Sequence, residues 1–314
     1  MRDNAVVIKE LRSRMRGGRA SLILTLYLIV LSTFAFGVID MTEQTMSMGA
    51  RPFYIGAILL LAISFFQLAM VLFLTPAFTV GAITREKEQQ THDLLVITKM
   101  SPLSIVIGKL FSAVAYIFLL ILASLPVTSI VFIFGGVSLL DFVLVYLFTL
   151  VTTIFFGAIG LFFSSLVRKT QFSTILSYSV VLTFVIGTLI TSVFIGVFFL
   201  QGPNADRETG ALLMNMVLIF NPFYSLGSIF SSMVPGPFSI PTIVGGPDGQ
   251  QGARLIADWL YTLIVYSILT VLLILASAQL IKPINRWSFK FILRRSGKEN
   301  AQLDKSMIVS QSGE

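Results

Sequence analysis

Residues 84–95 read TREKEQQTHDLL, and they decide how the rest of the chain is interpreted. The stretch carries two bases and three acids. It stands between two strongly apolar runs, FFQLAMVLFLTPAFTVGAI at 65–83 and IVIGKLFSAVAYIFLLILASLPV at 105–127. A hydrocarbon interior does not accept such a group of charges. The pattern therefore predicts a polar helix that joins two membrane spans at the membrane surface.

Composition places the whole chain among integral membrane proteins. The mean hydropathy is +0.90, and only 12% of the residues are charged. Apolar runs of about 20 residues or more are long enough to cross a bilayer as helices. We therefore predict an all-α integral membrane fold in a single transmembrane domain over residues 1–314. Its six transmembrane helices are expected at 20–39, 53–82, 104–134, 142–166, 172–200 and 257–281.

The basic residues predict the orientation of these spans. If six spans alternate in direction, all of the 22 Lys and Arg except Arg51, Arg207 and Arg254 fall on one side of the membrane. The positive-inside rule makes that side cytoplasmic, together with both termini. We expect a multi-pass protein of the plasma (inner) membrane with a cytoplasmic tail over 282–314. The net charge of +7 is then a topology signal, and no nucleic-acid partner is expected.

Residues 3–18, DNAVVIKELRSRMRGG, predict an amphipathic helix that lies in the membrane interface and contacts lipid. Val7, Leu11 and Met15 recur every four residues, while Arg12 and Arg16 fall largely elsewhere around the helix. The simpler alternative is a basic leader that only sets the topology.

The outer segment 201–256 contains an apolar stretch at 212–233 that is broken at Asn221-Pro222. Proline disfavours helical geometry in the residue before it, so we predict two short helices that meet there as a re-entrant or interfacial hairpin. Asn221, Pro222 and Phe223 are the candidate outer gate. A seventh span would carry the basic tail to the outside, and the charge count argues against it.

Two spans carry further patterns. In the fourth, Gly157, Gly160 and Ser164 form a strip of small residues that lets another helix approach closely. Packing within the chain is the favoured interpretation, and a subunit interface is the alternative. The fifth span is rich in hydroxyls, which either bond to the backbone of their own helix or line a transport path. The candidate path-lining residues are Ser177, Tyr178, Thr183, Thr188 and Thr191.

The sequence lacks the residues of most catalytic sites. There is no cysteine, the only histidine is His92, and no Walker phosphate-binding loop occurs. The centres of the predicted spans carry no charged residue, whereas an ion-driven carrier would require ionisable residues there. We therefore expect no catalytic residue, no metal site and no cofactor on this chain. Its energy source is expected to be another protein.

The charged stretch is the natural place for that protein to bind. Thr84 is predicted to cap a helix over 84–100, with Glu86 and Glu88 in its positive first turn. A solvated loop helix is the alternative. The candidate coupling residues are Arg85, Glu86, Glu88, Thr91, Asp93, Leu94 and Leu95.

The segment REKEQQTHDLLVITKMSPLS at 85–104 resembles the coupling helix of type-2 ATP-binding-cassette exporters. The family pattern has Glu, then Gly-Thr-Leu-Glu-Leu-Leu, then Thr-Pro-Leu-Ser. The residues that match it in kind are Glu86 or Glu88, Thr91, Asp93, Leu94, Leu95, Thr98 and Ser101. Gln90 stands where the family has Gly, His92 where it has Leu, and Lys99 where it has Pro. NPFYSLG at 221–227 is similar to the family's outer hairpin.

The resemblance implies a permease subunit with six spans that works by alternating access. Separate ATPase subunits would hold the ATP and magnesium, and a second permease copy or a paralogue would complete the path. Two other hypotheses stay open on the residues alone. One is a channel or carrier that needs no ATPase, and the other is a scaffold subunit of a membrane complex. The cargo is not identified; an uncharged route suits an amphiphilic or lipid-like substrate.

Overall fold

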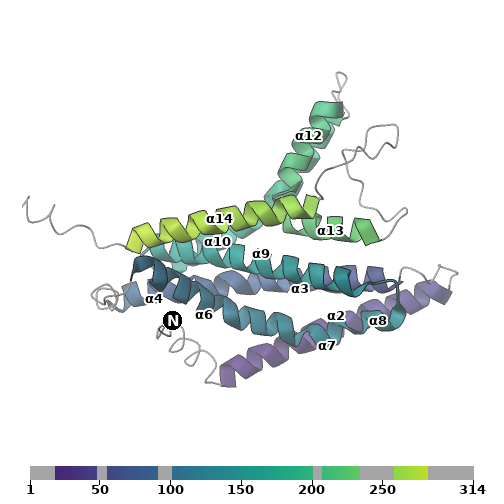
Figure 1. The fold of residues 1–314 in the computed structure, drawn as a ribbon, viewed down its shortest axis with the longest axis horizontal. Coiled ribbons are helices and arrows are strands. Elements are labelled where there is room, and N and C mark those ends of the chain that lie inside the picture. The colour runs from purple at the N-terminus through teal and green to yellow at the C-terminus, as the bar shows by residue number, and fades with distance from the viewer. Residues whose placement is uncertain (1–17, 48–54, 91–100, 201–206, 234–257, 282–314) are drawn as a thin grey trace, which may run out of the picture.

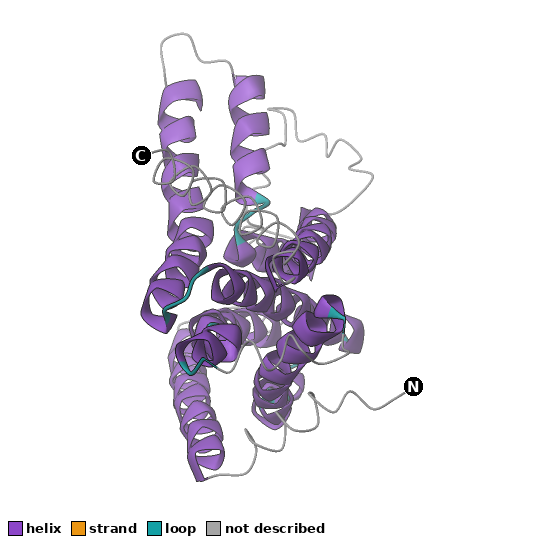
Figure 2. Cartoon of the chain, turned by 90° about the vertical axis from the view of Figure 1, so that its left-hand side faces the viewer, coloured by secondary structure: helices purple, strands orange, loops and turns teal. Residues whose placement is uncertain are grey.

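The structure is a computed structural model, and it describes residues 18–47, 55–90, 101–200, 207–233 and 258–281. All regular structure within these ranges is helical (Figure 2). Six stretches are long and apolar enough to cross a membrane, which confirms the predicted all-α integral membrane fold. They are Ala20–Thr42, Ile55–Glu88, Pro102–Phe134, Leu139–Leu166, Thr170–Phe199 and Asp258–Ile281. The helix predicted for 3–18 and the tail over 282–314 lie outside the described residues.

The spans form one elongated bundle (Figure 1). The first residues of α2 and the last residues of α4 and α14 lie at the same end, which we call the α4 end; α13 lies toward the other, the hairpin end. The helices of the spans are α2 (Gly18–Ser47), α3 (Ile55–Thr79), α4 (Gly81–Glu88), α6 (Pro102–Ala123), α7 (Leu125–Thr128), α8 (Val131–Phe134), α9 (Leu139–Leu166), α10 (Thr170–Leu182), α11 (Thr188–Ile195) and α14 (Asp258–Ile281).

The fourth span, α9, is the centre of the bundle. It packs against α3, α6, α10 and α14, and 67% of its most apolar window is buried. Glycine allows the close approach: a Cβ on Gly160 would lie 2.0 Å from Oγ1 of Thr79 in α3. On another side, Phe155 stacks on Tyr266 of α14 with ring centroids 4.2 Å apart. The small-residue strip therefore serves packing within the chain, as favoured from the sequence.

The fifth span lies at the periphery and is not a uniform helix. Only 11% of its most apolar window is buried, and Ile190, Val193 and Phe194 are each more than 60% exposed. Two π-helical turns interrupt it, η2 (Thr183–Gly187) and η3 (Gly196–Leu200). The span therefore has a broad apolar face that the described part of the chain leaves exposed.

The hairpin consists of α12 (Arg207–Leu218) and α13 (Pro222–Met233), which are bent by 108° with respect to each other. Figure 1 shows α12 rising away from the bundle while α13 runs along it. The predicted break at Asn221-Pro222 is thus confirmed. A bend of this size also means that the two helices do not form a straight seventh span.

Candidate functional site

The charged stretch begins inside the helix of the second span. After α3, the chain turns only at Val80 and continues as α4, which ends at Glu88. Thr84 is buried, and its hydroxyl donates to the Val80 carbonyl at 2.8 Å. The prediction that Thr84 caps a new helix is therefore wrong, because a threonine inside a helix can bond to the carbonyl four residues earlier. Glu86 and Glu88 occupy the last turn of α4 instead of a first turn.

Residues of α4 nevertheless bind three other spans, and we call this set of contacts the polar junction. Its members are Ile83, Thr84, Glu86, Lys87 and Glu88 of α4 with Lys109 of α6, Ser164 and Ser165 of α9 and Thr170 of α10.

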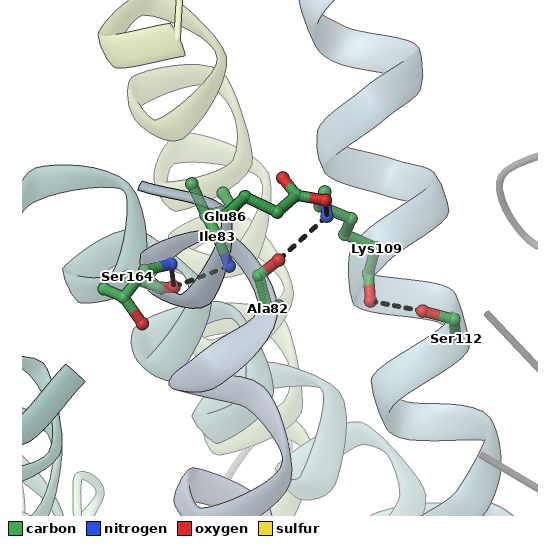
Figure 3. A network of polar contacts seen from close by, with 7 residues as sticks. Ala82, Ile83, Glu86, Lys109, Ser112 and Ser164 are labelled. Atoms are coloured by element: carbon green, nitrogen blue, oxygen red, sulfur yellow. Dashed lines mark hydrogen bonds and ion pairs between the residues drawn. The ribbon is translucent and has the colours of Figure 1, made fainter. Parts of the chain in front are cut away.

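The contact to the third span is an ion pair between Glu86 and Lys109 (Figure 3). Lys109 Nζ lies 2.6 Å from Glu86 Oε1 and donates to the Ala82 carbonyl at 2.8 Å. The Lys109 side chain is 1% exposed, whereas Glu86 is 24% exposed. A buried ammonium group must be paired to be tolerated. Glu86 therefore compensates the charge that α6 places inside the bundle.

The contact to the fourth span provides hydrogen-bond partners for backbone groups at the start of α4 and at the end of α9. Backbone N–H groups at the start of a helix lack partners in their own helix, and Ile83 is among those of α4. Ser164 Oγ accepts from the Ile83 N–H at 2.9 Å and from the next N–H, that of Thr84, at 3.0 Å (Figure 3). In return, Lys87 donates to the Ser165 carbonyl at the end of α9. A cation is favourable at that negative end of a helix.

The contact to the fifth span is a cap on α10. Glu88 Oε1 accepts from the Thr170 N–H at 2.7 Å, and its Oε2 lies 3.0 Å from the Thr170 hydroxyl. A carboxylate at the positive end of a helix is stabilising. The last turn of α4 is thereby connected to the first turn of the fifth span.

The helix ends just beyond these contacts in a strained turn. Gln90 has φ = 57°, the left-handed region that glycine adopts most readily. It is the only non-glycine residue with positive φ in the described part of the chain. Its amide donates to the Lys87 carbonyl at 3.3 Å, as in a common helix ending. Glycine at this position in the family pattern thus has a physical reason.

The other candidate coupling residues separate into two groups. Arg85 is exposed at the α4 end, and Glu86 and Glu88 belong to the polar junction. The rest of that set and the candidate residues of the N-terminal helix lie outside the described residues. These are Thr91, Asp93, Leu94, Leu95, Val7, Leu11, Arg12, Met15 and Arg16.

The hydroxyls of the candidate path-lining residues bond mainly to the backbone of their own helix. Ser177, Thr183, Thr188 and Thr191 each donate to the carbonyl four residues earlier. Tyr178 instead donates to the Phe73 carbonyl of α3 at 2.8 Å. Four of the five hydroxyls thus make the bond that the simpler interpretation expects, and their role in a path stays a prediction.

At the hairpin end, the backbone elbow at 219–221 is bonded by side chains of the last span. Thr262 donates to the Ile219 carbonyl and Tyr266 to the Phe220 carbonyl, both at 2.9 Å. Tyr266 is fully buried and lies eight residues into α14, about 12 Å from the start of that helix at 1.5 Å per residue. A bent backbone among apolar spans needs such partners, because hydrocarbon offers none.

The candidate gate residues lie at this elbow. Asn221 is buried, and Pro222 opens α13 at the position that proline favours. The Phe223 ring packs edge-on against Phe65 of α3, with centroids 5.7 Å apart. The sequence singled out these three residues. It did not single out Lys109, Thr170 or Tyr266, and it named Ser164 only as a small residue of the packing strip, since their roles depend on contacts between distant helices. A lysine within an apolar run was the one available signal.

Six helices that are long and apolar enough to cross a membrane define a multi-pass membrane protein. The particular family follows from sequence comparison: residues 8–278 match the family model described as ABC-2 family transporter protein. The chain therefore belongs to the ABC-2 transporter family and is an ABC transporter permease, a class that works with ATP-binding subunits. No curated protein sequence matches the chain.

Proposed function

We propose that the chain is one half of an exporter permease, driven by separate ATPase subunits that bind at the α4 end. Two halves, identical or paralogous, would enclose the path across the plasma membrane, with both termini in the cytoplasm. ATP hydrolysis with magnesium would take place on the partner, since this sequence has no Walker loop. Export as the direction is inferred from the family resemblance, and an amphiphilic or lipid-like cargo suits the uncharged spans.

The observation that carries this proposal is the polar junction. It joins the last turn of the second span to the third, fourth and fifth spans through Lys109, Ser164 and Thr170. A displacement of the segment that follows Glu88 is therefore delivered to three spans at once. The hairpin at the other end, with Asn221, Pro222 and Phe223 at its elbow, would gate the exit. The N-terminal helix would provide a second contact with the ATPase.

The contacts of the polar junction also limit which residues can serve only to dock the ATPase subunit. Glu86 and Glu88 already bind within the chain, so reversing their charge would loosen the bundle as well as any docking contact. We therefore place the docking contacts on the segment that includes Thr91, Asp93, Leu94 and Leu95. This assignment allows docking to be tested apart from folding.

Cysteine cross-linking provides the test, because the chain has no cysteine of its own. Asp93→Cys is introduced and the complex with the co-purified ATP-binding subunit is treated with a short bismaleimide. We expect a cross-link to that subunit, which carries a cysteine placed in its membrane-facing surface. The matched control is Met41→Cys, an exposed position in the later part of α2, the helix whose first residues lie at the α4 end; it should give none. Equal cross-linking at both positions, or at neither, would contradict the proposal.

A further inference from the structure

The π-helical turn η2 sits where the hairpin touches the fifth span. In η2, the Thr188 N–H donates to the Thr183 carbonyl, five residues back instead of four. Such a turn holds one residue more than an α-helical turn. It therefore rotates everything that follows by about one residue, or roughly 100°, relative to a continuous α-helix. The register of α11 depends on whether this turn is kept.

One side chain of the hairpin binds the turn directly. Asn221 Nδ2 donates to the Val185 carbonyl at 2.9 Å and to Thr188 Oγ1 at 2.8 Å. Val185 lies within η2, and Thr188 is the first residue after it. We call these contacts of Asn221 with Val185 and Thr188 the clasp. They stabilise the π register because one binds a backbone carbonyl inside the turn and the other binds the hydroxyl of the residue that closes it.

The same side chain fixes the start of α13. Asn221 Oδ1 accepts from the Phe223 N–H at 2.9 Å and from the Tyr224 N–H at 3.2 Å. The two amide protons and the two lone-pair sites of the side chain are all used. Aspartate offers no donor for the clasp, and serine has an oxygen for the cap but no amide. Asparagine is therefore the residue that can do both tasks at once.

The elbow that carries Asn221 is itself held by the sixth span, through Tyr266 and Thr262. The clasp is consequently a direct link between the hairpin and the fifth span at the π turn, and α12 of the same hairpin packs along α11 and η3 just beyond it. A π turn and an α turn are discrete arrangements that differ by one step of register. A link that binds one of them selectively shifts the equilibrium between the two.

We propose that η2 is a two-state joint, held in the π register by Asn221, and that release of the clasp returns it to an α-helix. The outer part of the fifth span then turns by one residue. Because the hairpin is the proposed outer gate, this inference rests on the proposed function: opening of the gate would be the event that releases the clasp. Ser192, now 4% exposed, would turn outward, and Thr191, now exposed, would take its inward position.

The test measures the register of the span in the full-length chain, reconstituted in lipid vesicles without ATPase and without substrate. Single cysteines at 190, 191, 192 and 193 carry a spin label, and collision with oxygen reports lipid exposure at each site. With the unaltered hairpin, the collision rate with oxygen should be lowest at position 192. Asn221→Ser, which keeps an oxygen for the cap of α13 but has no amide, should move the minimum to 191.

Ser225→Ala is the matched control, because it breaks a different bond of the same hairpin, the one of 2.6 Å between Ser225 and Thr262. Its minimum should stay at 192. A minimum that remains at 192 in Asn221→Ser, or a flat profile there, overturns the proposal, as does a shift in Ser225→Ala. Failure of the ATPase cross-link would leave this measurement unchanged, so the two proposals fail separately.

Discussion

The polar junction and the elbow hold opposite ends of the same bundle, and they do so with different chemistry. The junction uses charged groups, with Glu86 against Lys109 and Glu88 against the first turn of α10. The elbow uses neutral donors only, chiefly Asn221 and Tyr266. Charge is tolerated at the end of a span, where Glu86 is still 24% exposed, whereas deeper among the spans it is costly.

The difference indicates two mechanical roles. The ion pair between Glu86 and Lys109, whose loss would leave a buried charge, makes the junction a stiff unit. Neutral hydrogen bonds have net contributions of about 1 kcal/mol each, so they can be exchanged during a conformational cycle. We infer a rigid input at the α4 end and an adjustable output at the hairpin end.

The largest effect is expected when the ion pair is broken from the exposed side. Glu86→Ala leaves Lys109 buried without its carboxylate, which should lower the free energy of unfolding by about 3 kcal/mol. Unfolding by SDS titration in mixed micelles measures this. Glu86→Ala combined with Lys109→Met should recover most of the loss, because no buried charge remains. A single variant as stable as the parent would show that the junction is not stiff.

A smaller effect is expected from filling the space between α9 and α3. In Gly160→Ala the new methyl group would meet Thr79, and overpacking of this kind costs about 2 kcal/mol. The control is Gly37→Ala, since a methyl group there has no atom within 4 Å. The same titration should show no loss for Gly37→Ala, and a gain of up to about 1 kcal/mol, because alanine is more favourable than glycine inside a helix. Equal behaviour of the two variants would mean that α9 does not hold α3 closely beside the junction.

At the elbow we expect a loss of about 1 kcal/mol for Tyr266→Phe, because the Phe220 carbonyl then lacks its donor. Ser267→Ala, which removes an exposed hydroxyl bonded within its own helix, serves as the comparison and should be neutral. If Tyr266→Phe cost as much as Glu86→Ala, the contrast between a stiff junction and an exchangeable elbow would be lost.

The smallest effect should be a gain. Gln90→Gly places a residue without Cβ in the left-handed turn that ends α4, so the free energy of unfolding should rise by up to about 1 kcal/mol. Gln89→Gly is the control, because Gln89 has φ = −82° and needs no glycine there. A loss of stability in Gln90→Gly would show that this turn is not strained.

Much of this architecture was predictable from the sequence. Long apolar runs identified the six spans. Asn221-Pro222 identified the bend, because proline disfavours helical geometry in the residue before it. The two π turns were not predictable, since Thr183 and Gly196 begin them in sequence that resembles any apolar helix.

The polar junction was misjudged for a different reason. Threonine before two glutamates is a typical start of a helix, but it is equally compatible with the interior of one. Only the partners on other spans, such as Ser164 and Lys109, decide between the two. The sequence around Thr84 does not indicate those partners, because they lie on other spans. Some residues of the polar junction, such as Glu86 and Glu88, were therefore predictable from the sequence, whereas their contacts with other spans were not.

The central claim is that ATP acting at the α4 end changes the hairpin end. Spin labels at Met41→Cys on α2 and Met216→Cys on α12, both exposed, report the distance across the hairpin end. Pulsed EPR is recorded on the complex with its ATP-binding subunit, with labelled chains diluted by unlabelled ones. Addition of ATP and magnesium should move the distance distribution outside its nucleotide-free range. An identical distribution in both states, while the partner hydrolyses ATP, would contradict the account.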